Sequence, residues 1–139
     1  MISQKTRYAF RAMFYLARTE GPVAVGTIAA HEKISRKFLE LIMLELKRHR
    51  LVNSRRGKQG GYELARPADS ITYAEVIRAV EGPLAMAPCA SVTAYGQCED
   101  CYDAKVCAIR KVLTEVRNAT AGILEKHSLA DYLAVLPPV

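Results

Sequence analysis

Hydrophobic positions at the start of the chain recur at helical spacing in two separate runs. Over residues 6–17 the apolar side chains fall on one helical face, and the arginines of this stretch lie elsewhere. Gly21-Pro22 then breaks the chain, and a shorter apolar run over residues 25–29 ends in a polar turn beginning at His31. The pattern predicts a long and a short amphipathic helix.

A third apolar stripe follows the polar turn. Its spacing predicts another helix, which Ser35 is expected to cap. The stripe consists of Phe38, Leu39, Ile42, Leu46 and Leu51. The second and third helices are separated only by a tight turn, and this arrangement is typical of a helix-turn-helix.

Residues 51–64 contain two short strand-like segments around a loop with three glycines and three cations. This pattern predicts a β-hairpin with a flexible basic tip. A glycine-rich loop can also cradle nucleotide phosphates, but the Walker spacing is absent and no helix follows the loop directly. A wing beside the helix-turn-helix is therefore the favoured interpretation.

The second half of the chain begins with a capping box, Thr72 with Glu75, which predicts a helix that ends near Gly82-Pro83. Apolar residues then recur at helical spacing from Val106 to position 127, which would form a helix about 33 Å long at 1.5 Å per residue. So small a domain cannot cover such a helix. We expect its apolar stripe to pack on the same helix of a second copy of the chain. The alternative is that the stripe packs on another part of its own chain.

The predicted fold is mostly α with a small β-hairpin wing, a winged helix-turn-helix plus a long dimerisation helix. We assign residues 1–82 to the DNA-binding domain and residues 83–103 to a cysteine-containing sensor loop. Residues 104–139 then contain the dimerisation helix and a C-terminal segment, in which Ser128 is expected to cap a last short helix.

Charged residues are distributed unevenly along the chain, and this adds a functional indication to the predicted fold. Residues 1–67 hold 14 Lys and Arg against five acids, whereas residues 68–139 hold six against nine. A basic half suggests that this part approaches a polyanion such as nucleic acid, although a solvated basic surface is the alternative. The apolar run at residues 12–17 is too short for a signal peptide or membrane span, so a cytoplasmic protein without membrane contact is expected.

A helix-turn-helix followed by a basic hairpin places one helix in the major groove of double-stranded DNA and a wing against the backbone or minor groove. On the third helix, Lys37 can donate to guanine, and Glu40 can accept from cytosine or hold a neighbouring arginine. The wing cations should neutralise phosphates. The candidate DNA-binding residues are Ser35, Arg36, Lys37, Glu40, Arg55, Arg56 and Lys58.

All four cysteines fall within one stretch: Cys89, Cys98, Cys101 and Cys107. Clustered thiols in a cytosolic chain favour a metal or redox role, and four thiolates are a common ligand set for an iron-sulfur cluster. A reversible disulfide, structural zinc and inert thiols remain alternatives. Zinc is less favoured because only one close cysteine pair is present.

An enzyme is the rival class, because the Cys98-x2-Cys101 spacing could mark a thiol oxidoreductase. That chemistry normally needs alternating strands and helices, which the pattern does not predict. Each of the three histidines lies at a predicted turn or helix end, away from any candidate nucleophile. We therefore predict no enzyme activity. A metal-free regulator that responds to a protein or small-molecule partner is a second rival.

Several short motifs, in this order, resemble the iron-sulfur cluster regulators that include IscR, NsrR and RirA, the Rrf2 family. They are Thr6–Ala9, Ile34–Ser35, Phe38–Glu40, Arg50–Val52, Arg56–Gly57, Gly60–Tyr62 and Val76–Gly82. The resemblance covers nearly the whole chain. It implies a homodimeric winged-helix repressor or activator in which Lys37, Glu40 and Arg56 contact DNA.

The resemblance also implies a cluster held by Cys89, Cys101 and Cys107 with a fourth ligand from elsewhere. This chain departs from the family pattern in three ways: the spacing between Cys89 and Cys101 is longer, Arg110 stands where some members have a histidine, and residues 7–8 are Arg and Tyr where others use an acidic ligand from the partner chain. Cys98 is then either the fourth ligand or a resolving thiol.

Overall fold

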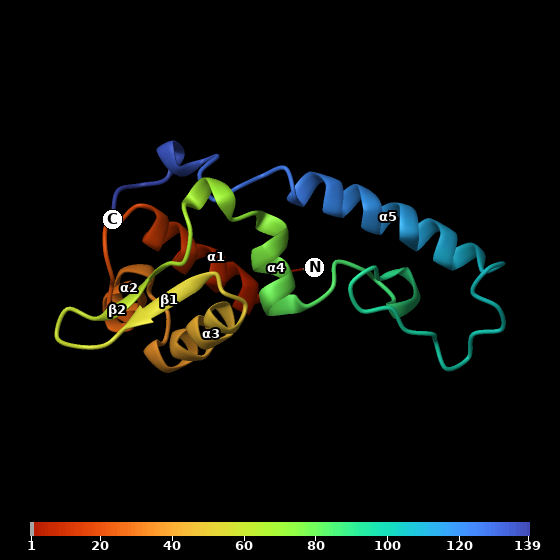
Figure 1. Ribbon diagram of the computed structural model, residues 1–139, viewed down its shortest axis with the longest axis horizontal. Coiled ribbons are helices and arrows are strands. Elements are labelled where there is room, and N and C mark those ends of the chain that lie inside the picture. The colour runs from red at the N-terminus through yellow and green to blue at the C-terminus, as the bar shows by residue number, and fades with distance from the viewer. Residues whose placement is uncertain (1) are drawn as a thin grey trace.

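A computed structural model describes residues 2–139 (Figure 1). Its α-helices are α1 (Gln4–Ala17), α2 (Val25–Glu32), α3 (Arg36–Arg48), α4 (Tyr73–Glu81) and α5 (Ala108–Leu124). Its strands are β1 (Val52–Arg55) and β2 (Gly61–Leu64), and short 3-10 turns lie at Ala68–Ser70, Pro88–Ala90 and Leu133–Val135. Across the described residues, no helix combines the length and the apolar character needed to span a membrane.

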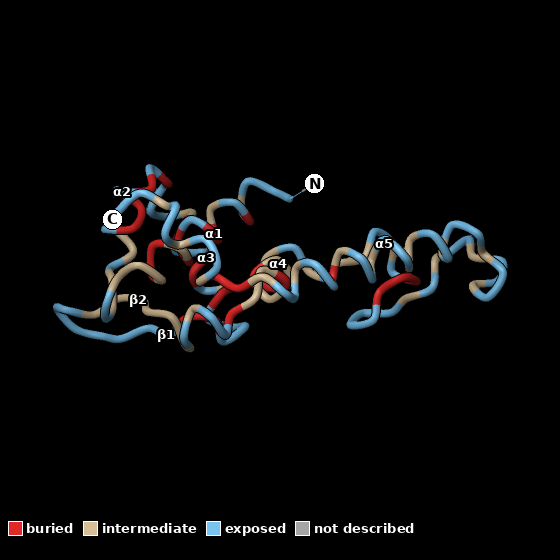
Figure 2. Tube along the Cα trace, turned by 90° about the horizontal axis from the view of Figure 1, so that it is seen from above, coloured by how far each residue is buried: buried red, intermediate tan, exposed pale blue. Residues whose placement is uncertain are grey.

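The hydrophobic core lies almost wholly in the N-terminal half, residues 2–82, where α1, α3 and α4 pack together and α2 packs against α3. Figure 2 shows the buried positions concentrated there. Leu39, Ile42, Leu46 and Leu51 are buried as the stripe predicts, and Met43 joins them. The helical spacing therefore identified the inward face of α3 correctly.

The turn between α2 and α3 differs in detail from the prediction. Helix α2 continues through His31 and ends at Glu32, and the C-cap residue Lys33 adopts a left-handed conformation with φ of 54°. His31 is therefore helical. Ser35 occupies the N-cap position of α3, but its side chain makes no capping hydrogen bond. The turn is held instead by main-chain bonds such as Ile34 N to the Ala29 carbonyl, at 2.9 Å.

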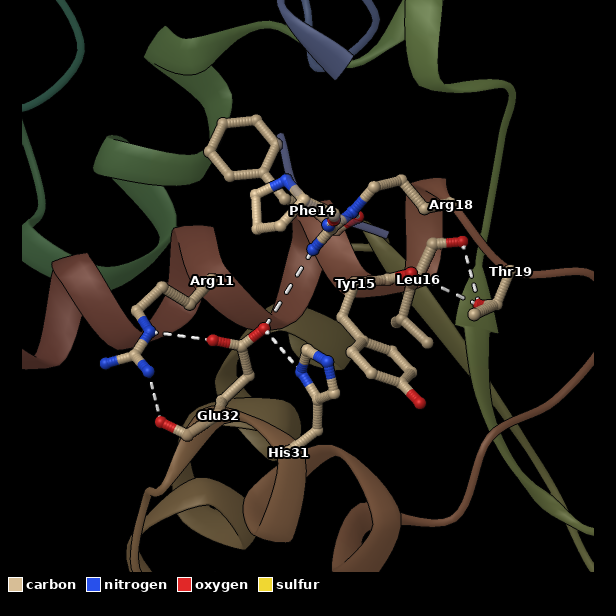
Figure 3. A network of polar contacts seen from close by, with 9 residues as sticks. Arg11, Phe14, Tyr15, Leu16, Arg18, Thr19, His31 and Glu32 are labelled. Carbon is tan, nitrogen blue, oxygen red and sulfur yellow. Dashed lines mark hydrogen bonds and ion pairs between the residues drawn. The ribbon is translucent and has the colours of Figure 1, made fainter. Parts of the chain in front are cut away.

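A polar network joins α1 to the end of α2 (Figure 3). The Glu32 side chain is only 11% exposed, and its carboxylate lies 2.8 Å from Arg11 Nε, 3.2 Å from His31 Nδ1 and 3.9 Å from Arg18 Nη2. A carboxylate buried to this extent is costly unless it is paired. The network therefore fixes α2 against α1, and Arg18 extends it by donating to the Pro137 carbonyl.

The hairpin is antiparallel, with Val52 opposite Leu64 and Arg55 opposite Gly61. Its second strand is also bonded to the segment before α2, because Val23 and Tyr62 exchange two main-chain hydrogen bonds of 2.8 Å. Gly61 has φ of +147°, and a Cβ there would overlap the Val23 carbonyl. This glycine therefore serves close backbone packing that anchors the wing.

Helix α4 begins with the predicted capping box, in which Thr72 and Glu75 each accept a main-chain hydrogen bond from the other. Its last residue, Glu81, accepts hydrogen bonds from Ser3 N (2.7 Å) and from the Thr6 hydroxyl. These bonds lower the pKa of Glu81 to about 2. They tie the start of α1 to the end of α4, where the cysteine-containing loop begins.

Residues 83–124 form an arm, made of the cysteine-containing loop and α5, that extends away from the N-terminal half (Figures 1 and 2). Helix α5 has 17 residues and spans about 26 Å, which is shorter than predicted. It begins after Cys107, the N-cap residue, and ends at Leu124. The predicted extension to position 127 is wrong because the chain turns back there onto the N-terminal half.

The C-terminal segment packs on the start of α4. The His127 carbonyl accepts a hydrogen bond from Tyr73 N, and Ser128 forms a β-bridge with Thr72. Leu129 is fully buried in the core of the N-terminal half. Ser128 does not start an α-helix, contrary to the prediction, because the residues on either side of it are bonded to this neighbouring segment: Leu129 N donates to the Ile71 carbonyl at 2.9 Å, as Tyr73 N does to His127.

Candidate DNA interface and cysteine cavity

The first turns of α3 expose the residues expected to meet base edges. Ser35, Arg36, Lys37 and Glu40 are all exposed. Arg36 Nε donates to Glu40 Oε1 at 3.1 Å. Glu40 is thus exposed and paired with Arg36, and its role toward DNA stays a prediction.

The three wing cations differ in their surroundings. Arg55 Nε forms a 2.7 Å ion pair with Glu63 across the hairpin. Arg56 and Lys58 lie at the exposed tip, and neither forms an ion pair within residues 2–139. The positive charge of the wing that remains free for a phosphate is therefore concentrated on Arg56 and Lys58.

The wing lies close enough to α3 for side chains of the two elements to interact. Partial burial raises the pKa of Tyr62 on β2, and the charge of Glu40 on α3 raises it further. Lys47 Nζ near the end of α3 donates to the Ser54 hydroxyl on β1 at 2.6 Å. The hairpin tip lies at the end of the molecule remote from α5 (Figure 1). These contacts hold the hairpin that carries the basic tip against α3.

All four cysteines line one cavity of about 410 Å³ between the loop and the start of α5. Cys89 lies in the 3-10 turn Pro88–Ala90 and is buried, whereas Cys98, Cys101 and Cys107 are partly exposed. The four thiols are free, without a disulfide. Three separate parts of the arm thus bring their thiols to one place.

The cavity has an uneven set of charges. Asp100 and Asp103 are its acidic lining residues, and Arg110 is its one lining cation among the described residues. A hydrogen bond with the Cys89 thiol raises the pKa of Cys98, and the charges of Cys89 and Asp100 act in the same direction. Sequence reasoning had noted Arg110 only as a departure from the family pattern. Its place three residues after Cys107 was the available signal.

The donor chemistry of the cavity suits an iron-sulfur cluster better than a single ion. In residues 2–139, no three His, Cys, Asp or Glu side chains come together closely enough to hold one metal ion. A cluster distributes four thiolate ligands over two or more irons, so the ligands need not converge on one point. Four thiols around a cavity of this size fit that requirement, whereas tetrahedral zinc needs closer convergence.

The chain is similar in sequence to known transcriptional regulators. Residues 2–134 match the Rrf2 family, described as an iron-dependent transcriptional regulator. A Rhodobacter capsulatus protein named as a putative rrf2-like HTH-type transcriptional regulator is 38% identical over an alignment of 143 positions. The alignment covers 99% of this chain and 95% of that protein.

Two solved structures are similar over nearly the whole chain. CymR, described as the global cysteine regulator of B. subtilis, has a TM-score of 0.76 at 32% identity and covers 99% of this chain and 98% of its own. IscR from T. potens has a TM-score of 0.73 at 30% identity, covering 97% of this chain and 87% of its own.

Proposed function

The chain belongs to the Rrf2 family of helix-turn-helix transcriptional regulators, and from this premise we propose that it is a cytoplasmic homodimer that senses iron, redox state or nitric oxide through an iron-sulfur cluster in the cysteine cavity. The family membership carries the regulatory role. The DNA contacts, the dimer and the cluster are proposed from the geometry of this chain.

For DNA binding, we place the exposed start of α3 in the major groove and the wing tip on the backbone. Lys37 and the paired Arg36 and Glu40 face the bases in this arrangement, and Arg56 with Lys58 neutralises phosphates. Arg55 has a smaller role because Glu63 already offsets its charge. Residues 1–82 are thus assigned to DNA reading.

For the dimer, support comes from the exposed apolar stripe of α5. Ile109 is 70% exposed, Val112 59% and Ile123 61%, and Val116 continues the same face. A stripe of this kind is typical of a surface that another chain covers, and a symmetric pair of α5 helices is the simplest such arrangement. We assign residues 104–139 to this role.

One observation carries the sensing role: four thiols from separate parts of residues 83–107 line one cavity at the start of α5. Cys89, Cys98, Cys101 and Cys107 would hold the cluster, which would supply an iron- and oxidant-sensitive group at this position. The residues of the loop would then be tied to the first turn of α5.

The position of the cavity suggests how a signal reaches DNA. The loop connects the end of α4 with the start of α5, and α5 leads to the proposed dimer partner. Two α3 helices engage DNA together only when they are spaced about one helical turn apart. A change in the loop can therefore alter DNA affinity without touching a base contact, on the usual scale of about 1–3 kcal/mol.

The test compares wild-type protein with the Cys101→Ala variant after anaerobic purification. Wild type should contain iron and sulfide and absorb broadly near about 400 nm, as iron-thiolate chromophores do. Its affinity for the operator should change when iron is removed or an oxidant is added. Cys101→Ala should remain a folded dimer with residual DNA affinity but should lose this response, and a response identical to that of wild type would exclude the sensing role.

A metal-free thiol switch is the second candidate, and the position of Cys89 and Cys98 on the lining of one cavity favours it. The raised pKa of Cys98 weakens it, because the thiolate is the form that attacks in disulfide chemistry. Iron-free protein that still binds DNA and responds to oxidant through Cys98 would establish this candidate in place of the cluster.

A further inference from the structure

Arg110 is bonded to three separate points around the cysteine cavity. It lies in the first turn of α5, where its main-chain N–H donates to Cys107 Sγ at 3.5 Å. Its side chain turns back over the loop, so that Nε donates to the Cys89 carbonyl at 2.9 Å and Nη1 to the Ala104 carbonyl at 3.5 Å. One residue thus links the 3-10 turn of Cys89, the segment before Cys107 and the start of α5.

The bond to Cys89 spans 21 positions of the sequence and holds the far end of the loop. The 3-10 turn Pro88–Ala90 packs against α5. Cys89 and the next two residues are buried, whereas residues 92–95 and 97 are exposed. The guanidinium offers several donors in a rigid plane, and it therefore suits the bridging of two carbonyls at once. A lysine at this position would keep the charge but lose this geometry.

Arg110 also has a particular place in the charge balance of the cavity. It is the one lining cation among residues 2–139, opposite four thiols and the carboxylates of Asp100 and Asp103. Its guanidinium stays protonated and has no lone pair to offer a metal. It cannot act as a ligand, but it places a fixed positive charge in the lining that it shares with the four sulfurs.

We propose that Arg110 is the positioning residue of the cysteine cavity: it clasps the Cys89 end of the loop to the first turn of α5 and places a fixed positive charge beside the four thiols. The charge effect on a cluster rests on the function proposed above. The clasp does not, because its hydrogen bonds belong to the metal-free chain.

Hydrogen exchange of the full-length, metal-free protein tests the clasp. In Arg110→Ala, peptides covering residues 86–91 should exchange at least about fivefold faster than in wild type, since a hydrogen bond that orders them is removed. Peptides from α1 to α4 should be unchanged. Lys111→Ala is the matched control because Lys111 is the exposed neighbour of Arg110 and does not line the cavity. Equal exchange in wild type and Arg110→Ala would overturn the clasp.

The reduction potential of the reconstituted cluster tests the charge. Removal of a nearby positive charge disfavours the more negative, reduced form, so Arg110→Gln should have a lower potential than wild type. Arg110→Lys should lie between the two, and Lys111→Gln should match wild type. A potential for Arg110→Gln equal to that of Lys111→Gln would overturn this part of the proposal.

The two readouts separate failure of the inference from failure of the proposed function. If wild type binds no iron, the cluster is wrong, and hydrogen exchange still decides whether Arg110 clasps the loop. If wild type and Lys111→Gln load normally while Arg110→Gln loads poorly and exchanges faster at residues 86–91, the positioning role is supported. Normal loading, potential and exchange in Arg110→Gln would refute it.

Discussion

The N-terminal half and the arm differ in the burial of their apolar side chains: the first buries them within the chain, whereas the second leaves those of α5 exposed. In the N-terminal half, α1, α3 and α4 enclose residues such as Met13, Leu39 and Ile42, which are fully buried. Of the 17 residues of α5, only Ala121 is buried. The difference teaches that the first region has its packing partners within the chain, whereas the apolar face of the second lacks one.

The two regions also differ in charge. The free cations of the wing and the start of α3 lie on the N-terminal half, while the cysteine cavity on the arm holds two carboxylates and one arginine. Long-range attraction to DNA therefore acts on one end of the molecule, and the proposed sensing chemistry lies at the other. Four experiments test how far this division holds.

The largest effect should come from salt. A dimer contacting about 6–10 phosphates should lose affinity for its operator by on the order of 10³ or more between about 50 and 200 mM salt. Arg56→Ala should reduce the slope of log affinity against log salt by about one for each phosphate that is no longer neutralised. Arg117→Ala, a charge removal on the arm, is the control and should leave the slope unchanged. A flat titration of the wild type would contradict DNA binding.

Next in size is the cost of removing one isoleucine side chain in each region. Ile42→Ala should lower the free energy of unfolding by about 2–5 kcal/mol, because Ile42 is fully buried and a cavity would remain. Ile109→Ala, at a position 70% exposed, should change monomer stability by less than about 0.5 kcal/mol. Urea titrations at several protein concentrations measure both. Equal costs at high dilution would show that α5 is packed within its own chain.

A smaller effect is expected from charge on the apolar stripe of α5. Val116→Glu should weaken the dimer at least about tenfold, because the carboxylate would be buried without a partner at the proposed interface. Asn118→Glu, an exposed polar position on the same helix, should leave it intact. Sedimentation equilibrium gives the dissociation constants. An unchanged Val116→Glu dimer would place the interface elsewhere.

The smallest effect concerns the junction of the two regions. The pKa of Glu81 falls from 4.5 to about 2 on folding, so its stabilising contribution is present above pH 4.5 and is lost as the pH falls toward 2. Glu81→Gln should lower stability at pH 7 by about 0.5–1 kcal/mol, a figure reduced for the exposure of this residue to solvent. It should also flatten the stability profile between pH 4.5 and 2. Thermal melts across this range measure both, and parallel profiles for the two proteins would refute the role of Glu81.

Local patterns accounted for much of the fold, as two elements illustrate. The apolar spacing of α3 identified Leu39, Ile42 and Leu46 as its inward face, and the Thr72–Glu75 capping box marked the start of α4. Both signals depend on residues within about one or two helical turns of each other, and the sequence displays such relations directly. The exposed cations and the clustered cysteines were visible for the same reason.

Contacts between distant segments were not visible in that way. The predicted end of α5 at position 127 lies three residues beyond the observed end at Leu124. There the main chain of His127 is bonded to Tyr73, 54 positions away, and not to the preceding helical turn. The burial of Glu32 depends on Arg11 in α1 and on Arg18, the residue that follows α1. The ion pair of Arg55 depends on the hairpin register. The spacing of hydrophobic residues indicates which face of an element is apolar, but it does not indicate which segment packs on that face.

The sequence by itself therefore determined the helices, the wing, the basic end and the set of thiols, since each follows from neighbouring residue types. Only the tertiary structure decided that the four thiols share one cavity and that the side chain of Arg110 reaches back to Cys89. It also decided that α5 keeps its apolar stripe exposed. These features require segments far apart in the chain to take definite positions, and that placement is set by packing of the whole molecule rather than by local pattern.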